Sequence, residues 1–316
     1  MLSRALQHTV RGLIERLVPQ PSLEGLRLDG RVCLVTGATS GHGLALARWL
    51  ARLGGEVVLI GRSEERCRTA AREIGAATGR TPDVLLCDLS SRASIDRAAA
   101  GWLAGGRPLH VLCNNAGQVN LRRRASVDGL EMTLAVNYLA CFQLTLRLLP
   151  RLLGSATEAA PSRVVNVSSD THRMVSLDPD DLERRGRRHS LMGSYARSKL
   201  CIVHFTRELS RRLRGRGVVA NAVDPGPVES RIGQNNPGAA ADLLAVVMRH
   251  VFPAAEWAAR TAVWLAAAPE AAAVTGGYFK YGRPRTPRVA PGVGPRLWAA
   301  SAAITGASLP RESTPR

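Results

Sequence analysis

Residues 36–43 read Thr36-Gly37-Ala38-Thr39-Ser40-Gly41-His42-Gly43, between an apolar run at 31–36 and an amphipathic stretch at 43–52. The run has the composition of a buried strand, and the stretch has the periodicity of a helix. Glycines between a strand and a helix permit a tight turn and let the backbone approach a pyrophosphate at the helix N-terminus. The motif therefore predicts a dinucleotide-binding turn, with a plain turn as the alternative.

The alternation of strand and helix continues through most of the chain. Continuous apolar runs of strand length lie at 31–36, 56–60, 84–87, 109–113, 163–167 and 218–223. Amphipathic stretches of helical length lie between strands, at 43–52, 64–76, 128–149 and 195–214. Unbroken apolar runs are typical of strands that are covered on both faces. We therefore expect an α/β fold with a doubly wound, mostly parallel sheet and helices on both faces.

The domain organisation follows from where this alternation starts and stops. We assign residues 29–285 to one α/β domain and 286–316 to an extension with a short helix and a disordered end. Residues 1–28 form a leader with leucines on one helical face, which predicts a docked helix. A membrane-surface or partner helix is the alternative for this leader. Residues 226–255 follow the sixth strand and are expected to form a substrate loop.

The composition indicates which classes of partner and metal site we do not expect. The chain has 316 residues, 45% of them hydrophobic, and a formal net charge of +18. Only two of its 43 basic residues are lysines, Lys199 and Lys280, so we read the arginine excess as coding bias and expect no specific nucleic-acid partner. Its six cysteines lie at least 20 residues apart, which predicts no metal site and reduced, buried thiols in a cytoplasmic protein.

The end of the second predicted strand bears on which dinucleotide is bound. Folds that bind NAD usually place an acidic residue there for the ribose hydroxyls, whereas this chain has Gly61 followed by Arg62. A guanidinium can hold a 2′-phosphate with paired, charge-assisted hydrogen bonds. We therefore expect NADP(H) rather than NAD(H). Two alternatives are that Arg62 is one more surface arginine, or that Glu64 and Glu65 serve a ribose in a shifted turn.

Tyr195 and Lys199 carry the predicted chemistry. They lie four residues apart in a helical stretch, which places both side chains on one face. A free phenol has a pKa near ~10 and is a poor base at neutral pH, but a neighbouring ammonium stabilises the phenolate. This spacing therefore predicts that Tyr195 donates and accepts a proton near working pH.

Seven motifs, taken in order, resemble the short-chain dehydrogenase/reductase family. They are 36–43, Asp88-Leu89, Asn114-Asn115-Ala116-Gly117, Asn137, Ser168-Ser169, 195–199 and 225–230. The chain is most similar to the retinol dehydrogenase-like branch, through Arg62, the long segment between Ser169 and Tyr195, residues 274–279 and Leu297-Trp298. The resemblance implies a single Rossmann domain with a seven-stranded sheet.

The resemblance also implies a role for each matching residue. Tyr195 would exchange the proton with the substrate oxygen, and Lys199 would lower its pKa while binding the nicotinamide ribose. Ser169 would hydrogen-bond the substrate oxygen, and Asn137 would hold a water that links Lys199 to solvent. The cofactor-binding residues would be Gly37, Thr39, Ser40, Gly41, His42, Gly43, Arg62, Asp88, Leu89, Asn115, Ala116, Gly117, Tyr195, Lys199, Pro225, Gly226, Val228 and Ser230.

Some of these positions have simpler interpretations or depart from the family. Asp88 could cap a helix, and Asn137 could be a structural helix residue. His42 replaces the usual isoleucine, either as a tolerated change or as a phosphate contact. Asp224 stands where this branch often has histidine and alters the pocket wall. The basic segment 170–193 either covers the pocket or is a solvated loop.

These features favour an NADP(H)-dependent oxidoreductase acting on a small-molecule alcohol or carbonyl compound. The apolar run 243–248 favours a lipophilic substrate, although ordinary helix packing also explains it. The main alternative is a non-catalytic NADP(H)-binding regulatory or scaffold protein. A sugar-nucleotide epimerase would need glycine where Ser40 stands, and a hydrolase would need a GxSxG motif that the chain lacks. Whether the chain forms a homo-oligomer stays open.

Overall fold

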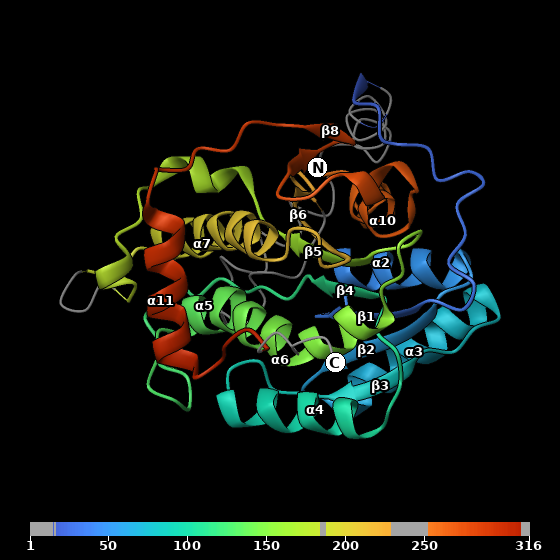
Figure 1. Cartoon of the computed structure of the whole chain (residues 1–316), viewed down its shortest axis with the longest axis horizontal. Helices are drawn as coiled ribbons and strands as arrows, with labels where there is room; N and C mark the ends of the chain where they lie inside the picture. Colours follow the sequence, from blue (N-terminus) through green and yellow to red (C-terminus); the bar gives the residue numbers. More distant parts are fainter. Residues whose placement is uncertain (1–14, 16, 184–187, 229–251, 311–316) are drawn as a thin grey trace, which may run out of the picture.

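The computed structural model describes residues 15, 17–183, 188–228 and 252–310. Their strands form one sheet in the order β3-β2-β1-β4-β5-β6-β7-β8 (Figure 1). The strands are β1 Val32–Thr36, β2 Glu56–Gly61, β3 Asp83–Leu86, β4 Val111–Asn114, β5 Ser162–Val167, β6 Val218–Asp224, β7 Tyr278–Lys280 and β8 Arg283–Pro284. The first seven are parallel, and β8 adds a short antiparallel pair to β7. The expected doubly wound sheet is confirmed, with eight strands instead of seven.

Helices cover both faces of this sheet (Figure 1). One layer contains α2 Gly41–Arg52, α3 Glu64–Thr78, α9 Ala255–Ala258 and α10 Arg260–Ala267. The other contains α4 Arg92–Ala104, α5 Met132–Leu134, the π-helical turn η1 Ala135–Leu139, α6 Ala140–Ser155 and α7 Leu191–Arg212, with α11 Val293–Thr305 outside α7. Short 3-10 turns are η2 Asp170–Met174, η3 Pro179–Asp181 and η4 Glu270–Ala273.

The burial of β1 shows why the strand runs are apolar throughout. Val32 and Leu34 pack into the core under α4 and α6, whereas Cys33 and Val35 pack into the core under α2 and α3. Because successive side chains point to opposite faces, a strand with helices on both sides needs apolar residues at every position. All six cysteines are buried and free, as the sequence predicts for reduced thiols.

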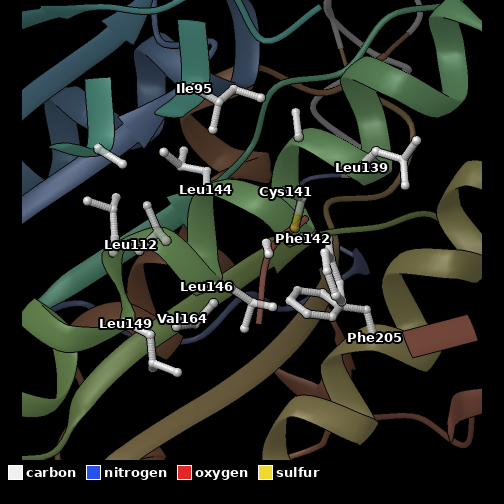
Figure 2. Packing of buried hydrophobic residues seen from close by; sticks show 14 of the residues in the cluster. Ile95, Leu112, Leu139, Cys141, Phe142, Leu144, Leu146, Leu149, Val164 and Phe205 are labelled. Carbon is white, nitrogen blue, oxygen red and sulfur yellow. The ribbon is translucent and has the colours of Figure 1, made fainter. Parts of the chain in front are cut away.

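The larger core lies between the sheet, α6 and α7, as Figure 2 shows for part of it. Phe142 and Phe205 bring their ring centroids to 5.3 Å, and α11 adds Trp298 at 5.1 Å from Phe142. Among the described helices, the continuous stretch Met132–Ser155 is long and apolar enough to cross a membrane. It is 83% buried inside the fold, so it is a core helix of this domain.

Several predicted features lie outside the described residues. They are residues 1–14 of the leader, Ser230, the run 243–248 with most of the substrate loop, and the end at 311–316. The membrane-surface alternative for the leader therefore stays a prediction. The described part of the leader contacts α10, where the Gln20 amide oxygen accepts a hydrogen bond from Thr261 at 2.7 Å.

Candidate active site

A cleft of about 860 Å³ runs along the carboxyl ends of the parallel strands. Sheet order reverses between β1 and β4, which is where ligands bind in doubly wound folds. The cleft is lined by the residues that the sequence predicts for catalysis and cofactor binding, with two exceptions. Asn137 lies buried behind the wall, and Ser230 falls outside the described residues.

The glycine turn is held against the loop that follows β4. Gly37 has a φ of +65°, and a Cβ there would lie 2.8 Å from the Ala116 Cα. A Cβ on Gly43 would collide with the Gly37 carbonyl and the Asn115 side chain. Side chains at either position would therefore force the turn away from β4. Glycine here keeps the start of α2 at the cleft, where a helix N-terminus favours phosphate.

Lys199 is a buried cation beside Tyr195. Its Nζ lies 5.4 Å from the centre of the Tyr195 ring and donates a hydrogen bond of 2.8 Å to the Val167 carbonyl at the end of β5. The side chain is 2% exposed, and burial lowers the pKa of Lys199 to about 8. Both residues come from α7, which begins at Leu191, four residues before the predicted start.

Tyr195 lies against Ser169 at the end of β5. Burial raises the pKa of Tyr195, the negative charge of Asp224 raises it further, and a side-chain hydrogen bond with Ser169 works in the opposite direction. The sequence predicts a lowered pKa for this phenol, whereas the fold raises it, because desolvation and the charge of Asp224 outweigh the hydrogen bond with Ser169. Ser169 Oγ also accepts the Thr171 amide at 3.3 Å and thereby caps η2.

The comparisons with known proteins bear on this geometry. The family model described as short chain dehydrogenase matches residues 31–239, which contain the glycine turn and both Tyr195 and Lys199.

The chain is a short-chain dehydrogenase.

Its relatives place it in the retinol dehydrogenase-like branch. Retinol dehydrogenase 13 of Homo sapiens is 36% identical over 90% of this chain and 87% of its own length. Polyprenol dehydrogenase of Mus musculus is 39% identical over 92% and 86%. A solved structure of the Pseudomonas aeruginosa RhlG/NADP active-site complex shares 28% identity and a TM-score of 0.64, over 80% of this chain and 95% of that one. Family membership makes this protein an oxidoreductase that uses a nicotinamide cofactor.

Asn137 of the dehydrogenase lies within the π-helical turn that interrupts the helix from Met132 to Ser155. Its Oδ1 accepts the Gln118 amide at 2.8 Å, and its Nδ2 donates to the Gln118 carbonyl and to Ser198 Oγ at 3.1 and 3.0 Å. A Cβ on Gly117 would lie 3.6 Å from Lys199 Nζ and 3.7 Å from Asn137 Oδ1. Asn137 therefore joins the β4 loop to α7 directly behind Lys199.

His42 ties the glycine turn of the dehydrogenase to the same loop. The imidazole is buried, and its Nδ1 lies 2.8 Å from Asn115 Oδ1. The Asn115 amide group donates to the Thr36 carbonyl at 2.8 Å, so the oxygen is left to accept from the imidazole. Burial lowers the pKa of His42, which keeps the ring neutral at physiological pH and disfavours the phosphate-contact interpretation.

Arg62 follows β2 and lines the far end of the cleft with an exposed side chain. Within the part of the chain that the structure describes, no carboxylate pairs with it. Glu64 pairs with Arg68 at 2.5 Å, and neither Glu64 nor Glu65 lines the cleft. Asp88 closes a turn by accepting the amide and hydroxyl of Ser90, while Ser91 caps α4.

The structure adds cleft residues that the motifs did not identify. Arg66 lies one helical turn after Arg62, and Asp170 and Lys280 lie near the catalytic end. Thr171 contributes a buried hydroxyl without a partner among the described residues. Met192 and Phe252 add apolar surface. The sequence signals for these residues were indirect: Lys280 is one of two lysines, Asp170, Thr171 and Met192 belong to the segment 170–193 that was considered as a pocket cover, and Phe252 belongs to the expected substrate loop.

Proposed function

We propose that this short-chain dehydrogenase is an NADP(H)-dependent oxidoreductase that interconverts a lipophilic alcohol and its carbonyl compound by a Ser-Tyr-Lys mechanism. The observation that carries the proposal is the convergence of Ser169, Tyr195 and Lys199 on one cleft at the carboxyl edge of the sheet. A regulatory or scaffold protein that only binds a dinucleotide has no need of a proton donor held in this way.

Each residue of the site then has its own role in the proposed reaction. A bound nicotinamide supplies or accepts the hydride at the substrate carbon. In the reducing direction, Tyr195 donates its phenolic proton to the substrate oxygen as negative charge develops there, and Ser169 stabilises that charge by a hydrogen bond. In the oxidising direction, Tyr195 accepts the proton of the alcohol. Lys199 stabilises the phenolate by its positive charge. We assign Asn137 a positioning role, in which it holds the loop after β4 against α7 behind Lys199.

The choice of NADP(H) over NAD(H) rests on the end of β2. Arg62 and Arg66 both line the cleft there, and the nearby Glu64 is occupied by Arg68. Two guanidiniums beside a cleft suit a 2′-phosphate, which a carboxylate at the same place would repel. The solved structure of Pseudomonas aeruginosa RhlG, to which this chain is similar, contains NADP and supports the same choice.

A lipophilic substrate is supported by the relatives and by the cleft. Retinol and polyprenol, named for two of the relatives, are both long apolar alcohols. The lining of the cleft includes Met192, which is 45% exposed, together with the partly exposed Phe252 and Val136. Apolar side chains in the lining favour a substrate with an apolar body.

The test is a panel of alcohols and carbonyl compounds that includes retinoids, polyprenols and short polar analogues. Turnover is followed by NADPH absorbance and repeated with NADH. We expect turnover of apolar substrates with NADPH. NADPH binding without turnover of any compound would support the non-catalytic alternative, and equal or better use of NADH would contradict the cofactor assignment.

A further inference from the structure

Two charged residues sit opposite each other where β6 and β7 end. Asp224 and Lys280 are register partners on these parallel strands, and Lys280 Nζ lies 3.0 Å from Asp224 Oδ2. The same ammonium lies 2.6 Å from Asp170 Oδ2, directly after the catalytic Ser169. All three side chains line the cleft beside Tyr195. The Asp224 side chain is only 4% exposed, so its charge is poorly screened by water.

Backbone amides hold the Asp224 carboxylate in this arrangement, and side chains hold the Asp170 carboxylate. Asp224 Oδ1 accepts the Gly226 amide at 2.8 Å, and Asp224 Oδ2 accepts the Asp170 amide at 3.2 Å. Asp170 Oδ1 accepts the Tyr278 hydroxyl at 2.9 Å. The cluster therefore connects the strand ends of β6 and β7 with the turn that carries Ser169.

Asp224 acts on the catalytic residues through its charge. It raises the pKa of Tyr195 and favours the protonated form of Lys199. The titratable groups that face it are Lys280, Tyr278 and Tyr281 from β7 and beyond, Asp170 and His172 from η2, Tyr195 and Lys199 from α7, and His42 from α2. Of these, Lys280 is the group whose ammonium directly contacts the Asp224 carboxylate.

We propose that Lys280 is a positioning residue of the active site, which holds Asp224 and Asp170 and offsets the negative charge that Asp224 directs at Tyr195. The inference rests on the proposed function, because Tyr195 is the residue it serves. Removal of one partner of a buried ion pair leaves the other charge uncompensated. Without Lys280, the phenolate of Tyr195 would face a bare carboxylate and would form less readily.

The test compares K280M, K280R, D224N and the double variant K280M/D224N in the full chain. The pH profile of kcat/KM with NADP+ and an active alcohol reports the ionisation of Tyr195. We expect K280M to move the profile toward alkaline pH by about 1 pH unit or more, which is the scale of a neighbouring charge. K280R keeps a cation and should restore the profile. The double variant should also return toward the wild type, because both charges of the Asp224–Lys280 pair are gone and Asp170 keeps its ion pair with Arg173.

An unchanged profile in K280M, or a profile that stays shifted in K280M/D224N, would overturn the inference. A second readout does not depend on turnover. In thermal unfolding, the losses of stability caused by K280M and by D224N should be non-additive, and the double variant should be more stable than K280M alone. If the wild type turns over no substrate, the proposed function fails, and this cycle still decides the inference: additive losses would show that Lys280 does not offset Asp224.

Discussion

Lys199 is held as a buried ammonium against a backbone carbonyl, in a place where an apolar side chain would be easier to bury. Its counterpart Tyr195 is partly exposed, and desolvation works against ionisation of both groups. Because a phenol is neutral at pH 7 and an ammonium is charged, Lys199 is the member of the pair that weakens the fold where the chemistry takes place, as is expected of a residue kept for function.

The substitution Lys199→Met tests how much the buried ammonium lowers the free energy of unfolding. The folded protein releases the Lys199 proton near pH 8, whereas an unfolded chain holds it up to 10.5. The unfolded state therefore binds more protons between these values, so the contribution of Lys199 to stability rises with pH through this window and is most unfavourable below pH 8. The depression corresponds to about 3 kcal/mol at neutral pH. We expect K199M to have the larger free energy of unfolding at pH 7.

Urea unfolding of the wild type and K199M at pH 7 and pH 10 measures this difference. The cysteines also titrate in this range once the chain unfolds, because burial raises their pKa in the folded protein, but they are common to both proteins and cancel in the comparison. The difference in the free energy of unfolding between K199M and the wild type should be smaller at pH 10 than at pH 7. An advantage that stays constant between the two pH values would contradict the assigned ionisation of Lys199.

At this scale, sequence spacing predicted part of the site and missed the rest. Tyr195 and Lys199 are four residues apart on one helix, so their proximity is a local property. The contact between Asp224 and Lys280 depends on the register of β6 against β7, which no local pattern specifies. The lowered pKa predicted for Tyr195 was wrong for the fold because local sequence does not reveal how deeply the phenol is buried.

Among the elements, the junction of β2 and α3 is the place where we propose that the cofactor is selected. Arg62→Gln removes one guanidinium from the cleft, and a lost charge-assisted interaction is worth about 1.5–3 kcal/mol. We expect kcat/KM for NADPH to fall about 10- to 100-fold while the value for NADH stays close to that of the wild type. The matched control is Arg72→Gln, since Arg72 lies on α3, is exposed and does not line the cleft. Equal losses with both cofactors would contradict the assignment.

The C-terminal helix α11 is a structural element of the domain. Trp298 packs edge-on against Phe142, and Arg212 lies 4.4 Å from its ring centre. Trp298→Ala should therefore lower the free energy of unfolding by about 3–5 kcal/mol, as is usual for a buried aromatic residue. Val127→Ala, at a side chain that is 75% exposed, should change it by less than about 0.5 kcal/mol. Urea unfolding measures both, and a loss for W298A as small as that of V127A would show that α11 is not part of the core.

At the scale of the whole molecule, periodicity predicted six of the eight strands and the helical layers that cover them, whereas it marked neither the three-residue β7 nor β8. Six apolar runs marked strands that the structure confirms, because both faces of those strands are covered. β8 escaped prediction because it is two residues long and contains a proline, which is usual only at a sheet edge. The π-helical turn at Asn137 lies within a stretch whose periodicity predicts an uninterrupted helix.

The proposed mechanism depends most on one residue, Tyr195, whose hydroxyl is proposed to exchange the substrate proton. Tyr195→Phe removes that hydroxyl and leaves the ring and the cleft in place. Tyr138→Phe is the matched control, because Tyr138 is a buried tyrosine that hydrogen-bonds Ser301 at 2.6 Å and does not line the cleft.

The most direct measurement is single-turnover reduction by Y195F and Y138F, with NADPH binding followed by fluorescence in the same preparations. The account predicts that Y195F binds NADPH about as tightly as the wild type and loses turnover by a factor of at least about 10²–10⁴, the usual contribution of a general acid. Y138F should retain turnover. Near-normal turnover in Y195F would contradict the central claim that Tyr195 transfers the proton.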